Sequence, residues 1–153
     1  MSPYDEYPSL VDRELVLQNS RVIIEYLDER FPHPPLLPVD PISRAKFRLA
    51  LNEIEHSWYT KYAEAYNDEV LDDKFVTEIK TYFLEIAPLI KRKFFMSDDF
   101  GLVDCSIAPL LWRLKSLDFD LAENNKVIGD YSERIFEREA FQDSLTETEK
   151  ELF

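Results

Sequence analysis

The pattern of apolar and polar positions centres on one segment, residues 101–114, that is apolar on nearly every side. Between Gly101 and Trp112 only Asp104 and Ser106 are polar. A helix with apolar side chains all around is stable in water only when other elements surround it. The pattern therefore predicts a buried central helix over 101–114.

Two residues mark the start of this helix. With Gly101 as the N-cap, Asp104 falls at the N3 position, where its carboxylate can accept a hydrogen bond from the backbone N–H of residue 101 and lies at the positive end of the helix dipole. A carboxylate at the mouth of a buried helix can also serve catalysis. Capping explains the placement fully, so we expect Gly101 and Asp104 to be structural capping residues.

Apolar residues at helical spacing predict further helices on both sides of the central one. Asp40-Pro41 has the form of an N-cap followed by a proline at N1, and opens a helix of roughly six turns. Ser144 and Glu147 have capping-box spacing for a last helix. The apolar positions are Phe47, Leu51, Ile54, Trp58, Tyr62 and Ala65, then Val76, Ile79, Phe83, Ile86 and Ile90, then Val127, Ile128, Tyr131, Ile135 and Phe136. The first two helices are predicted to form an antiparallel pair against the central helix.

Two short apolar runs near the N-terminus predict a β-hairpin. Residues 8–11 and 14–17 are joined by Asp12-Arg13, a polar pair suited to a tight turn. A helix is expected to follow the hairpin.

Asn19 or Ser20 can cap this helix, which should run to about Phe31. Its predicted apolar face comprises Ile23 or Ile24, Leu27 and Phe31. The segment as a whole predicts a hairpin followed by one amphipathic helix.

The helix ends at four closely spaced prolines, Pro32, Pro34, Pro35 and Pro38. They exclude helix and sheet and predict a stiff, extended segment. A segment ordered before binding loses less entropy on docking, and His33 between the prolines can donate or accept a hydrogen bond. Two interpretations stay open: a rigid interdomain linker with an idle histidine, or a partner-binding surface of Pro32, His33, Pro34 and Pro35.

Composition favours one mainly helical protein. The chain has 153 residues, of which 45% are hydrophobic and only 2 are glycine, which argues against a β-rich fold with many tight turns. No apolar run reaches the roughly 18 residues of a membrane span, and the first ten residues lack the form of a secretion signal. We expect a cytoplasmic protein without membrane contact.

Charge and the scarce reactive residues exclude several functions. The net charge of −13 includes no basic patch able to displace counterions from phosphates, so direct nucleic-acid binding is not expected. The single cysteine, Cys105, lies in the most apolar segment, where burial should raise its pKa and make it a poor nucleophile. His33 and His56, the only histidines, have no accompanying ligand pattern. We expect no metal and no cofactor.

Several motifs resemble the glutathione S-transferase fold. They are the order of hairpin, helix, proline linker and helical bundle, the strand start at Pro8-Ser9-Leu10-Val11, the helix start at Asn19-Ser20-Arg21, and the box from Gly101 to Asp104. More narrowly, the chain resembles the stringent starvation protein A family, which are bacterial RNA-polymerase-associated regulators. That likeness rests on residues 10–15, 20–21, 26–36, 58–60, 102–105, 108–114 and 136–138.

The resemblance implies two units. Residues 1–37 would be a partial thioredoxin-like segment with the proline linker, and residues 38–153 an all-helical domain like the C-terminal domain of glutathione transferases. The first strand-helix-strand unit of the family, which carries the catalytic residue of the transferases, is missing, so no enzyme activity is expected. A shortened gene product, an engineered fragment and a chain that borrows strands from a partner remain open.

Three positions would be vestiges of the family's glutathione site. Pro8 matches a cis-proline that presents backbone to glutathione, and Asn19-Ser20 match an acidic-Ser pair that holds the γ-glutamyl group. Asn19 lacks the charge of a carboxylate and should bind an ammonium more weakly. Asn-Ser is also an ordinary helix start, and we favour that interpretation.

The resemblance also implies a function. Members of the stringent starvation protein A family use the proline-histidine surface to engage the RNA polymerase holoenzyme, including its sigma subunit. The resemblance therefore implies a non-catalytic transcription regulator active during starvation or stress. Such a protein would act as a homodimer or as a heterodimer with a homologue. The alternative is a glutathione-binding or glutathione transferase-like protein.

Overall fold

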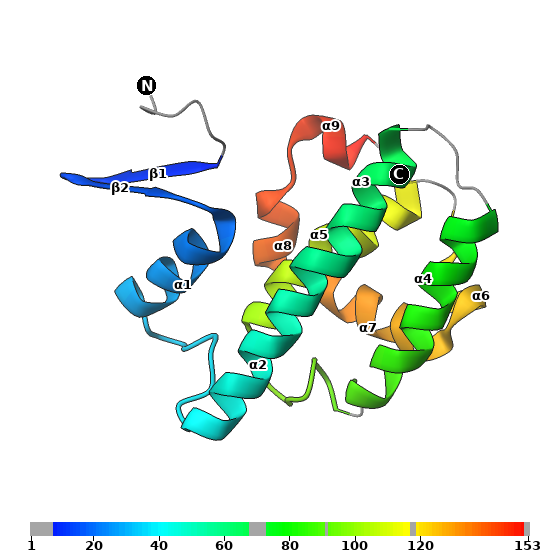
Figure 1. Cartoon of the computed structure of the whole chain (residues 1–153), viewed down its shortest axis with the longest axis horizontal. Coiled ribbons are helices and arrows are strands. Elements are labelled where there is room, and N and C mark those ends of the chain that lie inside the picture. The colour runs from blue at the N-terminus through cyan, green and yellow to red at the C-terminus, as the bar shows by residue number, and fades with distance from the viewer. Residues whose placement is uncertain (1–7, 68–72, 91, 117–118, 152–153) are drawn as a thin grey trace.

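The computed structural model describes residues 8–67, 73–90, 92–116 and 119–151 (Figure 1). Helices dominate this part of the chain, and a two-stranded antiparallel sheet lies at its N-terminal end, which confirms the mainly helical class. The elements are β1 (Ser9–Asp12), β2 (Leu15–Gln18), α1 (Ser20–Arg30), α2 (Pro41–Glu53), η1 (Ile54–Tyr59), α3 (Thr60–Asn67), α4 (Asp73–Ile86), η2 (Ala87–Leu89), α5 (Leu102–Ser116), α6 (Leu121–Asn124), α7 (Lys126–Phe136), α8 (Glu139–Ser144) and α9 (Glu147–Lys150). In the described part of the chain, every helix is too short or too polar to span a membrane.

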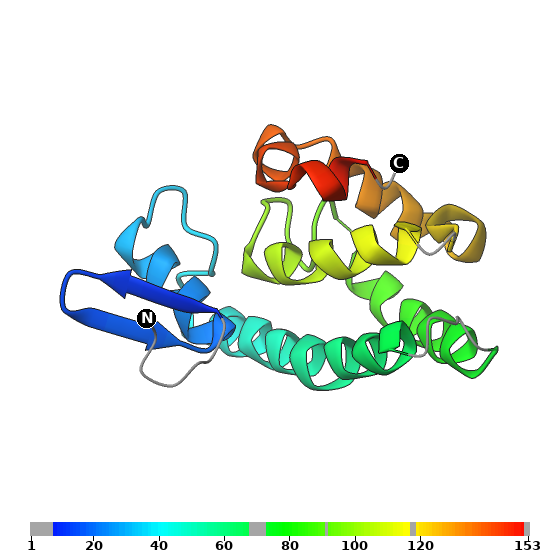
Figure 2. The same cartoon turned by 90° about the horizontal axis from the view of Figure 1, so that it is seen from above.

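The predicted central helix is α5. Figure 2 shows it between the long rod of α2, η1 and α3 on one side and α7 to α9 on the other. Val103, Ile107 and Leu111 on α5 are completely buried. The helix continues through Pro109. Its position explains why this segment is so apolar, since other elements cover most of its surface.

The rod follows the predicted start and length. Asp40 caps α2, its carboxylate accepting a hydrogen bond from the N–H of Ser43 at 2.8 Å, and Pro41 occupies the first turn. Between α2 and α3 the chain passes through a π-helix, η1, whose insertion no local pattern predicted. The side chain of Ala65, predicted to lie on the apolar face, is outside the described part.

The α4 helix runs antiparallel to this rod, as predicted. The Trp58 ring packs against those of Tyr82 and Phe83, and three residues later along the rod Lys61 pairs with Glu78 at 3.1 Å. Later residues of the rod therefore lie beside earlier residues of α4, as expected of an antiparallel pair.

The predicted hairpin is present, but its turn was placed one residue too early. Asp12 pairs with Leu15 as the last residue of β1, so the turn is Arg13-Glu14 and not Asp12-Arg13. Tyr26 on α1 donates a 2.5 Å hydrogen bond to the Asp12 carboxylate, which holds Asp12 in the strand. Arg13 takes the positive φ of 56° that the tight turn needs.

The prediction that Phe31 lies on the apolar face of α1 is wrong. Helix α1 buries Ile23, but Leu27 is 37% exposed and Phe31 is 66% exposed, so the prediction fails for Leu27 as well. The backbone leaves the helix at Phe31, where φ is −127° and ψ is 66°, so this side chain no longer follows the helical spacing. The Arg30 guanidinium lies 5.4 Å from the Phe31 ring instead.

The last helix begins two residues later than predicted. Ser144 is the final residue of α8, and its hydroxyl donates to the Phe141 carbonyl at 2.7 Å. The capping box is formed by Thr146 and Glu149, and each accepts a hydrogen bond from the backbone N–H of the other. Ser144–Glu147 and Thr146–Glu149 both have capping-box spacing in the sequence, and only the second pair forms the capping box.

Candidate partner-binding surface

The proline loop, residues 32–35, connects the end of α1 to the segment before α2. All four of its side chains, Pro32, His33, Pro34 and Pro35, are exposed. The peptide bond between His33 and Pro34 is cis. Phe31 precedes the loop and adds an exposed aromatic ring to the same stretch.

Hydrogen bonds that involve backbone groups fix both ends of this loop. At its entry the N–H of Phe31 donates to the carbonyl of Leu27 at 2.9 Å. At its exit the N–H of Leu36 donates to the carboxylate of Asp28 at 2.7 Å, and the Leu36 carbonyl accepts from the N–H of Leu102 at 2.9 Å. The exposed loop is therefore attached to α1 on one side and to the start of α5 on the other.

The exit of the loop lies against Gly101. A Cβ atom built on Gly101 would lie 3.0 Å from the Leu36 carbonyl oxygen and 3.5 Å from the Phe47 ring. The side chain of Leu37, the next residue, is buried in the core. Glycine at this N-cap thus permits the close approach of the segment that leaves the loop.

The carboxylate of Asp104 holds the start of α5, as predicted. It accepts hydrogen bonds from the N–H of Gly101 at 2.7 Å, the N–H of Phe95 at 3.0 Å and the hydroxyl of Tyr131 at 2.6 Å. Burial raises the pKa of this carboxyl despite these donors. All three donors serve the fold, which supports the capping role of Gly101 and Asp104.

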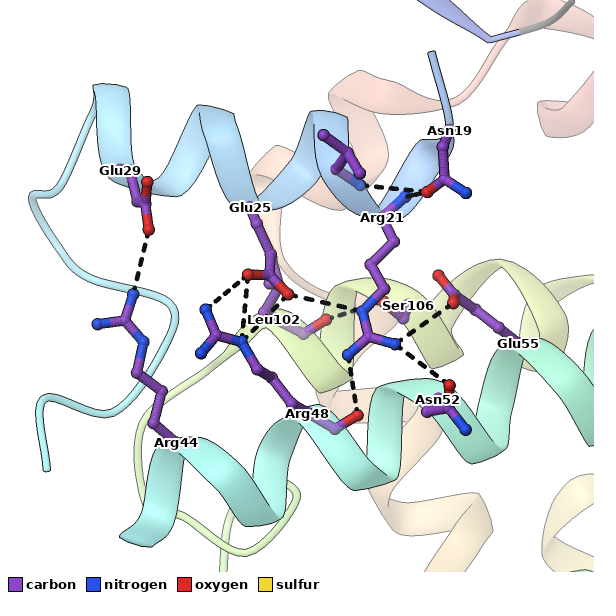
Figure 3. A network of polar contacts seen from close by, with 11 residues as sticks. Asn19, Arg21, Glu25, Glu29, Arg44, Arg48, Asn52, Glu55, Leu102 and Ser106 are labelled. Carbon is purple, nitrogen blue, oxygen red and sulfur yellow. Dashed lines mark hydrogen bonds and ion pairs between the residues drawn. The ribbon is translucent and has the colours of Figure 1, made fainter. Parts of the chain in front are cut away.

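A network of charged side chains joins α1 to α2 (Figure 3). The Arg48 guanidinium pairs with the Glu25 carboxylate at 2.8 Å, and Arg21 lies 3.5 Å from the same carboxylate. Arg21 also donates to the backbone carbonyl of Arg48 at 3.1 Å. The hydrogen bond from Arg48 lowers the pKa of Glu25, and the same contact raises the pKa of Arg48. These contacts set the position of α1, and hence of the proline loop, on the helical bundle.

Two further pairs extend this network along the two helices. Arg21 lies 3.8 Å from Glu55 and donates to the Asn52 side chain at 3.4 Å, while Arg44 lies 3.4 Å from Glu29 (Figure 3). Such partly exposed pairs contribute about 0.2–1 kcal/mol each. Their effect on orientation comes from their number and their spread along both helices.

Two of the three predicted glutathione-site positions lie together. Asn19 and Ser20 line a cavity of about 580 Å³ between α1, η1 and α5, with Tyr59, Cys105 and Ser106 among the other lining residues. Pro8 is exposed just before β1 and is not among the described residues that line this cavity.

The Asn19 side chain acts as the cap of α1. Its oxygen accepts from the N–H of Arg21 at 3.1 Å and from the N–H of Val22 at 3.3 Å. This confirms the N-cap prediction. The same oxygen is thereby occupied, which weakens it as a ligand group for an ammonium.

The cavity offers poor nucleophiles. Burial raises the pKa of the Cys105 thiol to about 11, as the sequence led us to expect. The Tyr59 hydroxyl donates to the Ser106 carbonyl at 2.9 Å, and burial raises its pKa as well. Among the described residues, no three side chains of histidine, cysteine, aspartate or glutamate gather as a metal site.

Sequence reasoning missed Asp28, the residue that holds the exit of the loop. It is 8% exposed. A signal was available, since Asp28 lies four residues after Ile24, one of the two residues that the sequence offered for the apolar face of this helix. A carboxylate at such a position needs a partner, but the sequence does not say that the partner is Leu36.

Comparison with known proteins first defines the class. A family model for the glutathione S-transferase N-terminal domain matches residues 1–35, and one for the C-terminal domain matches residues 39–139. The structure is similar to glutathione transferase Omega 3C from Trametes versicolor, with a TM-score of 0.83 and 18% identity over 95% of this chain and 70% of that one. A glutathione S-transferase from Rhodospirillum rubrum has a TM-score of 0.81 and 23% identity, and the match covers 95% of this chain and 73% of that one. The fold is that of the glutathione S-transferases.

Sequence relatives then define the family. The chain is 49% identical over 150 residues to a stringent starvation protein A homolog of Haemophilus influenzae, covering 96% of this chain and 71% of that protein. It is 46% identical over 157 residues to the stringent starvation protein A homolog of Coxiella burnetii, and the match covers 99% of this chain and 74% of that protein. The chain therefore belongs to the stringent starvation protein A family.

Proposed function

We propose that this chain is a non-catalytic regulator of bacterial transcription that acts during starvation or stress and binds the RNA polymerase holoenzyme, including its sigma subunit, through the proline loop. The name of its relatives supports the starvation role. One structural observation carries the docking role: the loop exposes all four side chains although both of its ends are hydrogen bonded to helices.

A loop of this kind is suited to binding a protein. Pro32, Pro34 and Pro35 restrict the backbone before any partner arrives, so association costs less conformational entropy than with a flexible loop. His33 offers a hydrogen bond, and Phe31 offers an exposed ring of the type that is enriched at interfaces. The net charge of −13 favours a protein partner over direct contact with nucleic acid.

The proposal includes a dimer, either of two copies or with a homologue. Two large apolar side chains separated by two helical turns, Ile42 and Leu49, are 71% and 72% exposed on α2. A second copy would remove such a strip from water. Because its partner is the polymerase, we place the protein in the cytoplasm.

Capture of RNA polymerase tests the docking role. Tagged wild-type chain should retain holoenzyme on a resin, and changing Pro32, His33 and Pro34 together to alanine should reduce capture at least about tenfold. Pro41→Ala is the matched control, since it removes an exposed proline at the start of α2 and should leave capture unchanged. Equal capture by the triple variant and the control would refute the proposal.

A second candidate, glutathione binding, is favoured by the cavity beside Asn19 and Ser20. Conjugation of glutathione to an electrophile above background, lost in Ser20→Ala, would support it. The occupied Asn19 oxygen and the high pKa of Cys105 make it the weaker candidate. We expect no conjugation above background.

A further inference from the structure

Asp28 differs from the other buried polar side chains in what it holds. The structure buries three of them among the described residues, Asp28, Asp104 and Ser132. Asp104 accepts hydrogen bonds from Gly101, Phe95 and Tyr131 and so joins the start of α5 to the core. Ser132 donates to the carbonyl of Ile128 within its own helix. Asp28 instead accepts the N–H of Leu36, which lies on the far side of the proline loop.

The hydrogen bond from Leu36 closes the loop onto the helix that precedes it. The Leu36 peptide is held from two directions, its N–H by Asp28 on α1 and its carbonyl by the N–H of Leu102 on α5. Only residues 29–35 lie between Asp28 and Leu36, and three of them are prolines. A short, proline-rich segment with both ends fixed has few conformations.

The energetic cost of burying the Asp28 carboxylate indicates that it has a role in fixing the loop. Burying a carboxylate is unfavourable unless its hydrogen bonds compensate, and an apolar residue at position 28 would pack on the inner face of α1 without that cost. The carboxylate of Asp28 accepts its hydrogen bond from Leu36, at the exit of the loop. Gly101 serves the same junction, because any side chain there would press on the Leu36 carbonyl.

We infer that Asp28 is a positioning residue for the proline loop: its carboxylate holds Leu36 so that Pro32, His33 and Pro34 are presented to a protein partner in one arrangement. This inference rests on the proposed function for the identity of the partner. The fixing of the loop itself is a property of the free chain.

The experiment compares three variants of the full chain. Asp28→Ala removes the acceptor and Asp28→Asn retains an acceptor oxygen. Glu85→Ala, which removes an exposed carboxylate on α4 outside the network that joins α1 to α2, is the control. Binding of each to purified RNA polymerase holoenzyme is titrated, and the order parameter of the His33 amide is measured by ¹⁵N relaxation in the free chain. Urea unfolding of each variant shows that the chain is folded in the assay.

We expect Asp28→Ala to weaken binding about tenfold and to lower the order parameter of the His33 amide, while Asp28→Asn restores both and Glu85→Ala changes neither. In a background that already carries the three alanine changes in the loop, Asp28→Ala should have no further effect on binding. A merely structural role would not produce this coupling.

The outcomes separate the inference from the proposed function. If the triple alanine change weakens binding but Asp28→Ala does not, the inference is wrong and the proposed function stands. If the triple change leaves binding intact, the proposed function is wrong, and the His33 amide then decides: an unchanged order parameter in Asp28→Ala would overturn the inference too.

Discussion

The hydroxyl of Tyr131 donates a 2.6 Å hydrogen bond to the carboxylate of Asp104. This contact attaches α7 to the first turn of the central helix, and Tyr131 is itself completely buried. The same turn receives Leu36 at the exit of the proline loop through the N–H of Leu102. The start of α5 is therefore the point at which the core and the candidate surface meet.

Removing the Tyr131 hydroxyl should destabilise the chain. In Tyr131→Phe the buried carboxylate of Asp104 keeps its two backbone donors but loses the third. We expect the free energy of unfolding in urea to fall by about 1–3 kcal/mol. Tyr82→Phe, which removes a half-buried hydroxyl on α4, is the control. Equal losses in both variants would contradict the role given to the hydrogen bond.

The pairing of Glu25 with Arg48 predicts a dependence of stability on pH. Because Arg48 lowers the pKa of Glu25 in the folded chain, the pair contributes stability above the ordinary carboxyl pKa of 4.5. That contribution is lost as the pH falls through the lower folded pKa. Glu25→Gln should therefore be less stable than wild type at pH 7, by less than about 1 kcal/mol because the pair is partly exposed. The difference should vanish in acid, and a difference that persists there would contradict this account.

Cys105 should resist alkylation in the folded chain. With burial raising its pKa to about 11 from 9.0, its thiolate fraction at pH 8 falls about a hundredfold, tenfold for each pKa unit. Iodoacetamide should modify the folded chain correspondingly more slowly than the chain in urea, as measured by mass spectrometry. Similar rates in both conditions would show a reactive thiol and would strengthen the glutathione hypothesis.

Gly129→Ala should destabilise the chain although alanine favours helices. A Cβ atom on Gly129 would lie 2.6 Å from both Cα and Cβ of Ala122, so α6 and α7 would have to separate. We expect a loss of about 1–3 kcal/mol in the free energy of unfolding. A gain of up to about 1 kcal/mol, the intrinsic preference of a helix for alanine, would show that the contact relaxes freely.

Local patterns predicted the starts of several helices. Asn19 caps α1, Asp40 and Pro41 open α2, and Asp104 reaches back to Gly101 at the start of α5. In each case the bond joins residues two or three positions apart. Such contacts depend on the sequence alone, so spacing was enough to find them.

The predictions that failed have both distant and local causes. The hairpin turn moved by one residue because Tyr26 holds Asp12 in β1. Phe31 was assigned to a buried face because its spacing continues that of α1, but the backbone leaves the helix there. Pro32 follows Phe31 and disfavours helical backbone at that residue, which the spacing of apolar residues does not take into account.

The same limit applies to the candidate surface. The prolines and His33 could be singled out from the sequence, and their side chains are exposed in the structure. The attachment of the loop could not be predicted, because Asp28, Leu36 and Leu102 come from three segments. Contacts that join separate elements emerge only when the fold brings them together.

The most direct test of the account is photo-crosslinking from within the proline loop. A photoreactive phenylalanine analogue in place of His33 should label a subunit of RNA polymerase holoenzyme on irradiation, whereas the same analogue in place of Leu84, which is 69% exposed on α4, should not. Labelling from position 33 alone would place the loop at the interface. Holoenzyme that binds the His33 variant but is labelled equally from both positions, or from neither, would contradict the central claim.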